Sequence, residues 1–136
     1  MSLSFWVGGK GFVAGDAGLL KSLFSTIVVR LENGEWGSRY PVLMRDLYAG
    51  RVPSSAADAA LKEVAAIRAG LSPHEPREVV WDFEQPELQP PWGSAISPHI
   101  SSLANYFVTS EGMDLLDVLS WALEEARRTG RDLTIG

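Results

Sequence analysis

Three carboxylates in the last third of the chain have the spacing that a metal site on a helix would need. Glu111, Asp114 and Asp117 recur every three residues, which places them on one side of an α-helix. Their oxygen atoms are ligands that suit Mg²⁺ or Ca²⁺. The same spacing is typical of a solvated acidic face, where carboxylates in the first turn complement the positive end of the helix dipole. We favour the acidic face and predict no metal site.

Other residue types that could support catalysis lack the arrangement that catalysis requires. In Gly8-Gly9-Lys10-Gly11 a glycine follows the lysine, whereas a phosphate-binding loop needs a longer glycine spacing and a hydroxyl residue at that point. His74 and His99 lack the paired spacing of a zinc-binding helix, and the chain has no cysteine. We therefore predict no enzyme activity, no catalytic residues and no cofactor. The alternative is a small enzyme or ligand-binding domain whose cleft, near a sheet edge, involves His99.

Charge is distributed unevenly along the chain. From Glu78 to Ala126 there are nine carboxylates and no lysine or arginine. Residues 1–72 sum to +2 and residues 73–136 to −7, within a net charge of −5. Such a surface attracts cationic partners and repels nucleic acid and anionic lipid. We expect a basic protein partner, and neither direct nucleic-acid binding nor membrane contact.

A tryptophan interrupts the carboxylate face of the helix expected to follow Ser110. The core-facing positions of this helix are Leu115, Val118, Leu119, Ala122, Leu123 and Ala126. The opposite face holds Asp114, Asp117, Trp121, Glu124 and Arg128. Aromatic anchors ringed by charges are typical of binding surfaces. Trp121 is therefore either such an anchor or a side chain that packs beneath another element or lies flat over its neighbours.

A second candidate contact region is the proline-rich segment 85–94. Its three prolines predict an extended, exposed loop, and loops of this length often carry function. Trp92 is either a loop anchor tucked into the core or an exposed contact residue. The predicted partner-binding residues of both regions are Asp82, Glu84, Glu87, Trp92, Asp114, Asp117, Trp121 and Glu124.

Apolar periodicity and end signals predict about four helices, over residues 17–32, 41–48, 54–70 and 110–130. Asp16 is the expected N-cap of the first helix and Asn33-Gly34 its end. Ser22, Ser25 and Thr26 fall on the polar side of this helix. A β-branched cluster at 26–29 favours a strand instead, since stiff side chains suit strands.

Alternation and bulky apolar runs predict strands at 5–7, 78–84, 100–109 and 133–135, although residues 101–104 also suit the start of a helical turn. The last thirty residues then form a strand-helix-strand unit, which implies a right-handed parallel crossover. The predicted fold class is α/β or α+β, with a small mixed, partly parallel sheet packed against about four helices.

The length of 136 residues and the apolar content of 46% suit a single domain spanning 1–136. Residues 1–3 read as a possible leader from an expression vector and carry no structural weight. The absence of cysteine and of any long apolar run makes a soluble, cytoplasmic protein the default expectation.

Several strings in the sequence carry a family resemblance. They are EWGSRYPVL at 35–43, DLYAGRVP at 46–53, VWD at 80–82, PWG at 91–93, YFVTS at 106–110 and GMDLL at 112–116. In this order they resemble the immunity protein 70 family of bacterial polymorphic toxin systems, from about residue 25 to the end.

The resemblance implies a cytoplasmic antidote that binds a cognate toxin domain and blocks its active site. Toxins that cut nucleic acid need cationic clefts, and an acidic surface with aromatic anchors mimics the polyanion that they grip. The barnase and barstar pair shows that close interfacial charge pairs can support such inhibition. Our leading hypothesis is thus a toxin-neutralising immunity protein that occludes the active site through an acidic, aromatic-anchored surface, with an adaptor that has no toxin partner as a third possibility.

Overall fold

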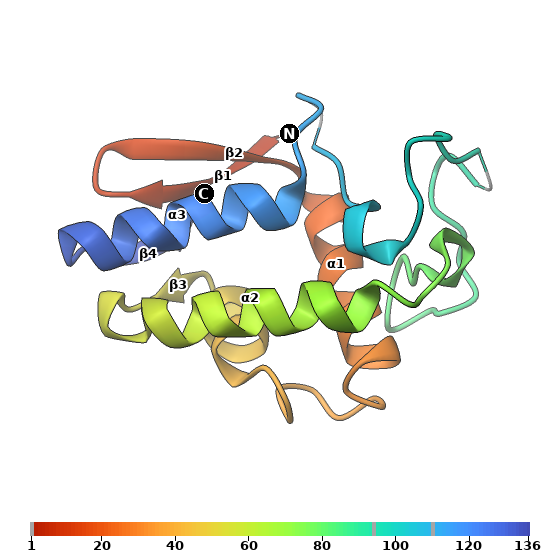
Figure 1. Ribbon diagram of the computed structural model, residues 1–136, viewed down its shortest axis with the longest axis horizontal. Coiled ribbons are helices and arrows are strands. Elements are labelled where there is room, and N and C mark those ends of the chain that lie inside the picture. Colours follow the sequence, from red (N-terminus) through yellow and green to blue (C-terminus); the bar gives the residue numbers. More distant parts are fainter. Residues whose placement is uncertain (1, 94, 110) are drawn as a thin grey trace.

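The computed structural model describes residues 2–93, 95–109 and 111–136. Its described part is an α+β fold in which a four-stranded sheet packs against helices (Figure 1). The strands are β1 (Ser2–Val7), β2 (Lys10–Asp16), β3 (Arg51–Val52) and β4 (Leu133–Ile135). The main helices are α1 (Ala17–Arg30), the π-helical segment η1 (Val42–Leu47), α2 (Ala57–Leu71) and α3 (Leu115–Thr129).

The sheet is antiparallel throughout, with strand order β2-β1-β4-β3, so the prediction of a partly parallel sheet is wrong. The strand expected before α3 is absent from the described residues, where only an isolated antiparallel bridge joins Val108 to Asp114. Strand β4 pairs antiparallel with both of its neighbours, β1 and β3. The described residues at the end of the chain therefore contain no parallel crossover.

The first strand begins earlier than expected and continues into a hairpin. Ser2 and Leu3 pair with Asp16 and Gly15, so these two residues of the segment read as a possible leader belong to the sheet. Phe5 is buried and Trp6 exposed, which is the alternation of a strand with one covered face. Two glycines in β2 weaken its apolar pattern, and for that reason this strand was not apparent in the sequence.

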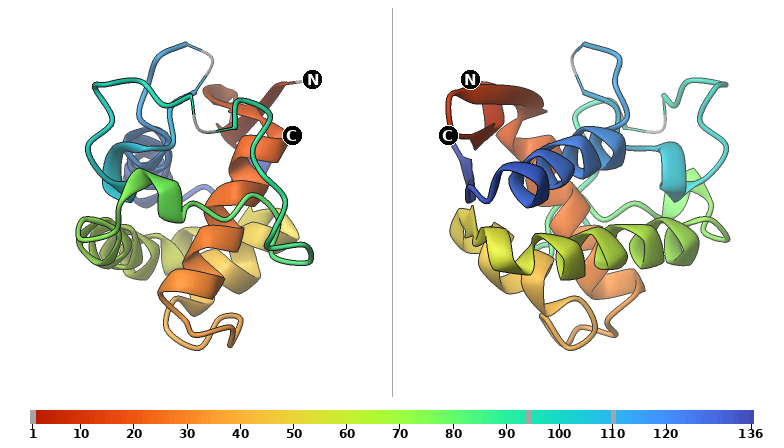
Figure 2. Two further views of the ribbon diagram at one scale, coloured as in Figure 1. Left: turned by 90° about the vertical axis from the view of Figure 1, so that its right-hand side faces the viewer. Right: turned by 60° about the vertical axis from the view of Figure 1, so that its left-hand side comes forward.

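The helices cover one face of the sheet. Figure 1 shows α2 and α3 side by side and running in opposite directions, while α1 crosses behind them, as the two views in Figure 2 confirm. Asp16 caps α1 as predicted, with its Oδ1 accepting from the N–H of Gly18 at 2.6 Å. The third helix starts at Leu115 rather than near Ser110, which lies outside the described residues.

The strand predicted at 78–84 does not form, because α1 supplies hydrogen-bonding partners to this segment. The hydroxyls of Ser22 and Thr26 donate to the carbonyl of Val80 at 2.8 and 3.2 Å. Thr26 also accepts from the N–H of Val80 at 3.0 Å, and Ser25 accepts from Phe83 at 3.0 Å. These hydroxyl side chains are fully buried, so their assignment to a solvated side of the helix is also wrong.

The strand predicted at 100–109 is likewise replaced by irregular structure. Ser102 caps a single 3₁₀ turn at Leu103–Asn105, and its side chain accepts from the N–H of Ala104. Segment 85–93 contains only turns and irregular backbone, as its prolines predict. Among the described residues, no helix is long and apolar enough to cross a lipid bilayer.

Two glutamates organise the chain between α1 and η1. The buried carboxylate of Glu32 accepts from the backbone N–H groups of Gly37, Arg39 and Tyr40 at 3.0 to 3.1 Å. Glu63 on α2 accepts from the first N–H groups of η1, those of Val42 and Leu43 at 3.1 and 2.9 Å. Burial raises the pKa of Glu63 above its ordinary value, against the opposing effect of these backbone donors.

Candidate partner-binding surface

The geometry of α3 fixes which of its side chains reach solvent. Asp114 is its N-cap, accepting from the N–H groups of Leu116 and Asp117 at 2.9 and 3.2 Å, and Gly130 ends it in the left-handed region with φ of 69°. All six predicted core-facing residues are buried: Leu115, Val118, Leu119, Ala122, Leu123 and Ala126. Trp121 is 47% exposed, so its indole does not pack beneath another element.

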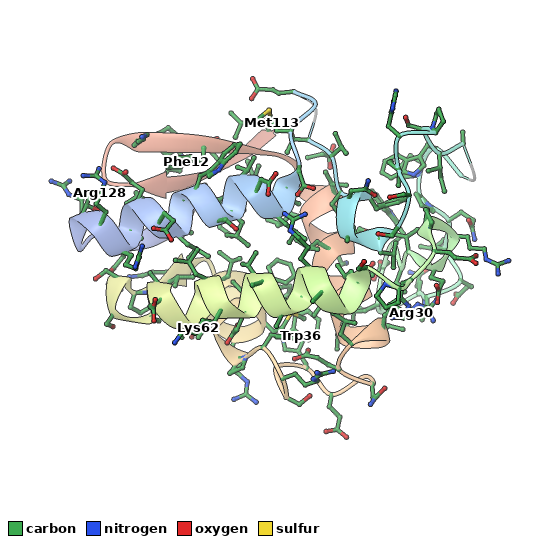
Figure 3. The ribbon with its side chains drawn as sticks, in the orientation of Figure 1. Phe12, Arg30, Trp36, Lys62, Met113 and Arg128 are labelled. Atoms are coloured by element: carbon green, nitrogen blue, oxygen red, sulfur yellow. The ribbon has the colours of Figure 1, made fainter. Side chains whose placement is uncertain are left out.

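Trp121 forms one wall of a groove between α3 and the edge strand β2. The groove encloses about 390 Å³ and is lined by Phe12, Val13, Glu111, Met113, Val118 and Trp121. Figure 3 shows Phe12 and Met113 along the same margin of the molecule, above α3. We refer to these six residues as the β2–α3 groove. Five of the six are apolar, so the groove offers a hydrophobic contact area with a single carboxylate at its rim.

A second hollow shares Phe12 and Trp121 with this groove. It encloses about 410 Å³ and is lined by Lys10, Phe12, Trp121, Glu124, Glu125 and Arg128. Arg128 and Glu125 form an ion pair there at 2.8 Å, and the ammonium of Lys10 lies 4.0 Å from Glu125. Hydrogen bonds from Arg128 lower the pKa of Glu125. Trp121 thus lines both an apolar hollow and a charged one.

The carboxylates at the start of α3 are paired with a cation from α2. Arg68 contacts Asp114 at 3.3 Å and Asp117 at 2.7 Å. Asp114 therefore serves two structural purposes, as the helix cap and as an ion-pair partner that joins α3 to α2. Asp117 is more exposed, and its side chain is 51% accessible.

Most of the acidic half of the chain is neutralised in this way. Six of its nine carboxylates pair with lysine or arginine: Asp82, Glu84, Asp114, Asp117, Glu124 and Glu125. A seventh, Glu78, contacts His74 at 3.1 Å. Glu87 and Glu111 are exposed and make no ion pair within the described part of the chain. The anionic field expected from the sequence is therefore reduced locally, by Lys21 and Arg68 from distant parts of the sequence and by the arginines in the last turn of α3.

The predicted residues of the 82–92 segment lie elsewhere on the molecule. Lys21 of α1 lies 3.5 Å from both Asp82 and Glu84. The loop that carries Glu87 lies at the opposite end of the molecule from the C-terminal half of α3 (Figure 1). The eight predicted contact residues thus form two groups rather than one continuous face.

Trp92 combines the two roles considered for it. Its indole N–H donates to the phenol oxygen of Tyr106 at 2.6 Å, and its ring packs edge-on against Trp81 at 5.3 Å. The side chain remains 40% exposed. Burial raises the pKa of Tyr106, whose phenol accepts the Trp92 hydrogen bond. Trp92 therefore anchors the proline-rich loop while part of its ring faces solvent.

Sequence reasoning missed most of the groove, including Phe12, Val13 and Met113. Phe12 lies on β2, where glycines obscure the strand pattern, and Met113 precedes the helix in a turn. Both side chains are at least partly accessible, with Met113 at 39%. The proximity of Gly112-Met113-Asp114 to a capped helix was the available signal, but only the fold brings these residues beside Phe12.

The residues considered for catalysis or metal binding are not assembled into a site. His99 is exposed and lies in the loop that precedes the 3₁₀ turn, with its carbonyl accepting from Asn105. His74 is engaged by Glu78. Across the described ranges, no group of three or more histidine or acidic side chains is arranged to hold a metal ion.

Comparison with known proteins gave one match. The family model described as immunity protein 70 matches residues 4–135, which is nearly the whole chain. Neither the curated proteins nor the solved structures contain a match.

Proposed function

Because the chain belongs to the immunity protein 70 family, we propose that it protects a bacterial cell by binding a cognate toxin domain and blocking its active site. This is a binding function and requires no catalytic residues or cofactor. It is performed in the cytoplasm, where a toxin delivered to or made in the cell would act.

The observation that carries this proposal is the exposed Trp121, which walls two hollows on α3. Large aromatic side chains in partly closed hollows account for much of the energy at protein interfaces. An indole that is 47% exposed also loses hydration when a partner covers it, which favours association. Trp121 is therefore the proposed centre of the interface, with Asp117 and Glu124 at its rim.

Asp114 has an indirect part in this proposal, since it positions α3 through the cap and the Arg68 ion pair. The other group of predicted residues forms a proposed second contact area, which consists of Asp82, Glu84, Glu87 and Trp92. A large toxin domain could reach both groups, because a standard interface buries about 800 Å² on each partner.

The proposed partner is basic. The chain carries a net charge of −5, and Glu87 and Glu111 are exposed carboxylates without an ion pair among the described residues. A cationic toxin cleft would supply the missing counter-charges and would be steered toward this surface. The paired carboxylates contribute less, because each already has a cation at short range.

Co-expression with the toxin domain encoded in the adjacent reading frame tests the proposal. Growth should be restored by this chain and not by an empty vector, and the chain should form a complex with a catalytically inactivated form of that toxin. A toxin domain from an unrelated system is the specificity control. Continued growth arrest, together with the absence of a complex, would refute the proposed function.

A further inference from the structure

One edge of the sheet is open next to the β2–α3 groove. The strand β2 lies at the end of the order β2-β1-β4-β3 and has β1 as its strand neighbour. Unpaired edges present backbone donors and acceptors that can pair with another chain. The question is which groups of β2 point outward.

The hydrogen bonds of β1 determine which backbone groups of β2 point outward. Ser4 and Gly136 exchange two backbone hydrogen bonds, each of 3.0 Å, so the polar groups of Ser4 face β4. Successive residues of an antiparallel strand direct these groups to opposite sides. Phe5 therefore faces β2, and its partner Phe12 faces β1.

The neighbours of Phe12 must point the other way. Gly11 and Val13 thus direct their N–H and C=O groups toward the open edge. No loop or helix in the described part of the chain gives a hydrogen bond to either residue. These four backbone groups match the pattern that an added antiparallel strand requires.

The lining of the groove indicates which kind of side chain an added strand should place in it. Phe12 shares the covered face of the sheet with Phe5, and Met113 and Trp121 line the hollow beside it. A strand added to β2 would direct alternate side chains to the same face, where an apolar residue fits the groove.

The charges near the edge of β2 indicate which charged residue the incoming strand should carry. Glu111 is exposed at the groove rim and has no ion pair among the described residues, whereas Lys10 lies 4.0 Å from Glu125. A lysine or arginine in the incoming segment would complement Glu111. A second copy of this chain is a poorer occupant, because it carries the same net charge of −5.

The β-bulge limits the length of the pairing. The register shifts between Leu3 and Ser4, which leaves Ala14 without a partner in β1. Beyond the bulge Gly15 turns its polar groups back toward β1, so the competent stretch is residues 10–13. The occupant is accordingly a short extended segment.

We propose that a short extended segment of the toxin, with an apolar residue beside a lysine or arginine, adds as a strand to the free edge of β2 and fills the β2–α3 groove. This inference rests on the proposed function and specifies how the partner is held. Main-chain hydrogen bonds to Gly11 and Val13 supply affinity, and the groove and Glu111 supply specificity.

Amide hydrogen exchange in the complex with the inactivated toxin domain tests the proposal. The amides of Gly11 and Val13 should exchange at least tenfold more slowly in the complex than in the free protein. The amide of Phe12, which already faces β1, is the internal reference and should change much less. Formation of the complex with unchanged exchange at Gly11 and Val13 would overturn the strand addition but leave the proposed function intact.

Two substitutions at one position separate backbone from side-chain effects. Val13→Pro removes the outward N–H, and proline is tolerated on edge strands, so the affinity for the toxin domain should fall about tenfold. Val13→Ala keeps the N–H while shortening the same groove-lining side chain, so its affinity for the toxin domain should stay well above that of Val13→Pro. Equal affinities of the two variants would contradict the proposal, as would protection of Gly11 and Val13 that arises from self-association without toxin. If Val13→Pro does not fold, the exchange measurement decides alone.

Discussion

Thr26 and Val80 exchange two hydrogen bonds across 54 residues of sequence. The threonine hydroxyl donates to the carbonyl of Val80 at 3.2 Å and accepts from its N–H at 3.0 Å. A helix side chain thus provides the hydrogen-bond donor and acceptor that the backbone of a neighbouring strand would otherwise provide. The segment after α2 is thereby held against α1 without joining the sheet.

Replacement of Thr26 by valine should destabilise the protein. The two side chains have similar shapes, but valine leaves the buried N–H of Val80 without its acceptor, which costs about 1–3 kcal/mol. Urea unfolding measures the loss. Thr134→Val, at an exposed position of β4, is the matched control and should change stability by less than about 0.5 kcal/mol. Equal effects of the two substitutions would remove the structural role assigned to Thr26.

Trp121→Ala should weaken toxin binding while leaving the thermal midpoint nearly unchanged. A central aromatic anchor contributes about 2 kcal/mol or more, which corresponds to about a thirtyfold rise in Kd. Titration calorimetry against the inactivated toxin domain measures the affinity. Trp6→Ala is the control, because Trp6 is 41% exposed on the uncovered face of the sheet. A large stability loss in Trp121→Ala, or an unchanged Kd, would contradict the interface centred on this residue.

Asp114→Ala should reduce stability more than Asp117→Ala. Both carboxylates pair with Arg68, but only Asp114 caps α3, and loss of a cap costs about 0.5–2 kcal/mol. The exposed pair of Asp117 contributes about 0–1 kcal/mol. Chemical denaturation distinguishes the two variants. If Asp117→Ala proves the more destabilising, the cap is not what secures the start of this helix.

Glu63 should make stability depend on pH in the acidic range. Burial raises the pKa of this carboxyl above 4.5, so its ionisation is less favourable in the folded protein than in the unfolded chain. Its contribution is fully present below the unfolded pKa and is lost as the pH rises through the folded pKa. Relative to Glu63→Gln, the unmodified protein should therefore be more stable at pH 4 than at pH 7.

Unfolding free energies of both proteins across this range measure the effect. Glu87→Gln, in the exposed proline-rich loop, provides the baseline for removing one carboxylate. A stability difference between the unmodified protein and Glu63→Gln that stays constant with pH would refute the raised pKa.

The helices were predictable because their signals are local. The third helix has a full apolar stripe and charges that suit both ends, and all of the predicted core-facing residues are buried, together with Leu116, which was not among them. The first helix was found despite its β-branched cluster, since Asp16 and the apolar spacing mark it clearly. The start of α3 was misplaced because Asp114, rather than Ser110, is the cap.

The sheet was less predictable because its partners are distant. Strands β3 and β4 have two and three residues, too few to establish a period. The direction of β4 depends on its pairing with β1 and β3, and no local sequence pattern shows which strands pair. The alternation at 79–83 did not correspond to a covered face, because Val80 is the buried residue of this segment and hydrogen bonds from α1, not strand pairing, hold it.

The candidate site was predictable in part. The helical period placed Trp121 opposite the core-facing residues, but it left open whether another element covers the indole, which the structure shows to be exposed. The groove was not predictable, because Phe12 and Trp121 meet only through the packing of β2 against α3. The ion pairs that neutralise most carboxylates also join residues far apart, such as Lys21 and Glu84. Summed charge along a sequence therefore overstated the local field.

The pairing of β1 with β4 sets an order of events during synthesis. The first strand leaves the ribosome before the rest of the sheet, but its inner partner is made only when residues 133–135 have been added. Until then, the hairpin of β1 and β2 lacks a neighbour on one side, and the helices have no finished sheet to cover. Nascent chains that lack residues 133–135 are consequently unable to complete the sheet, so the finished fold forms only after β4 has been synthesised.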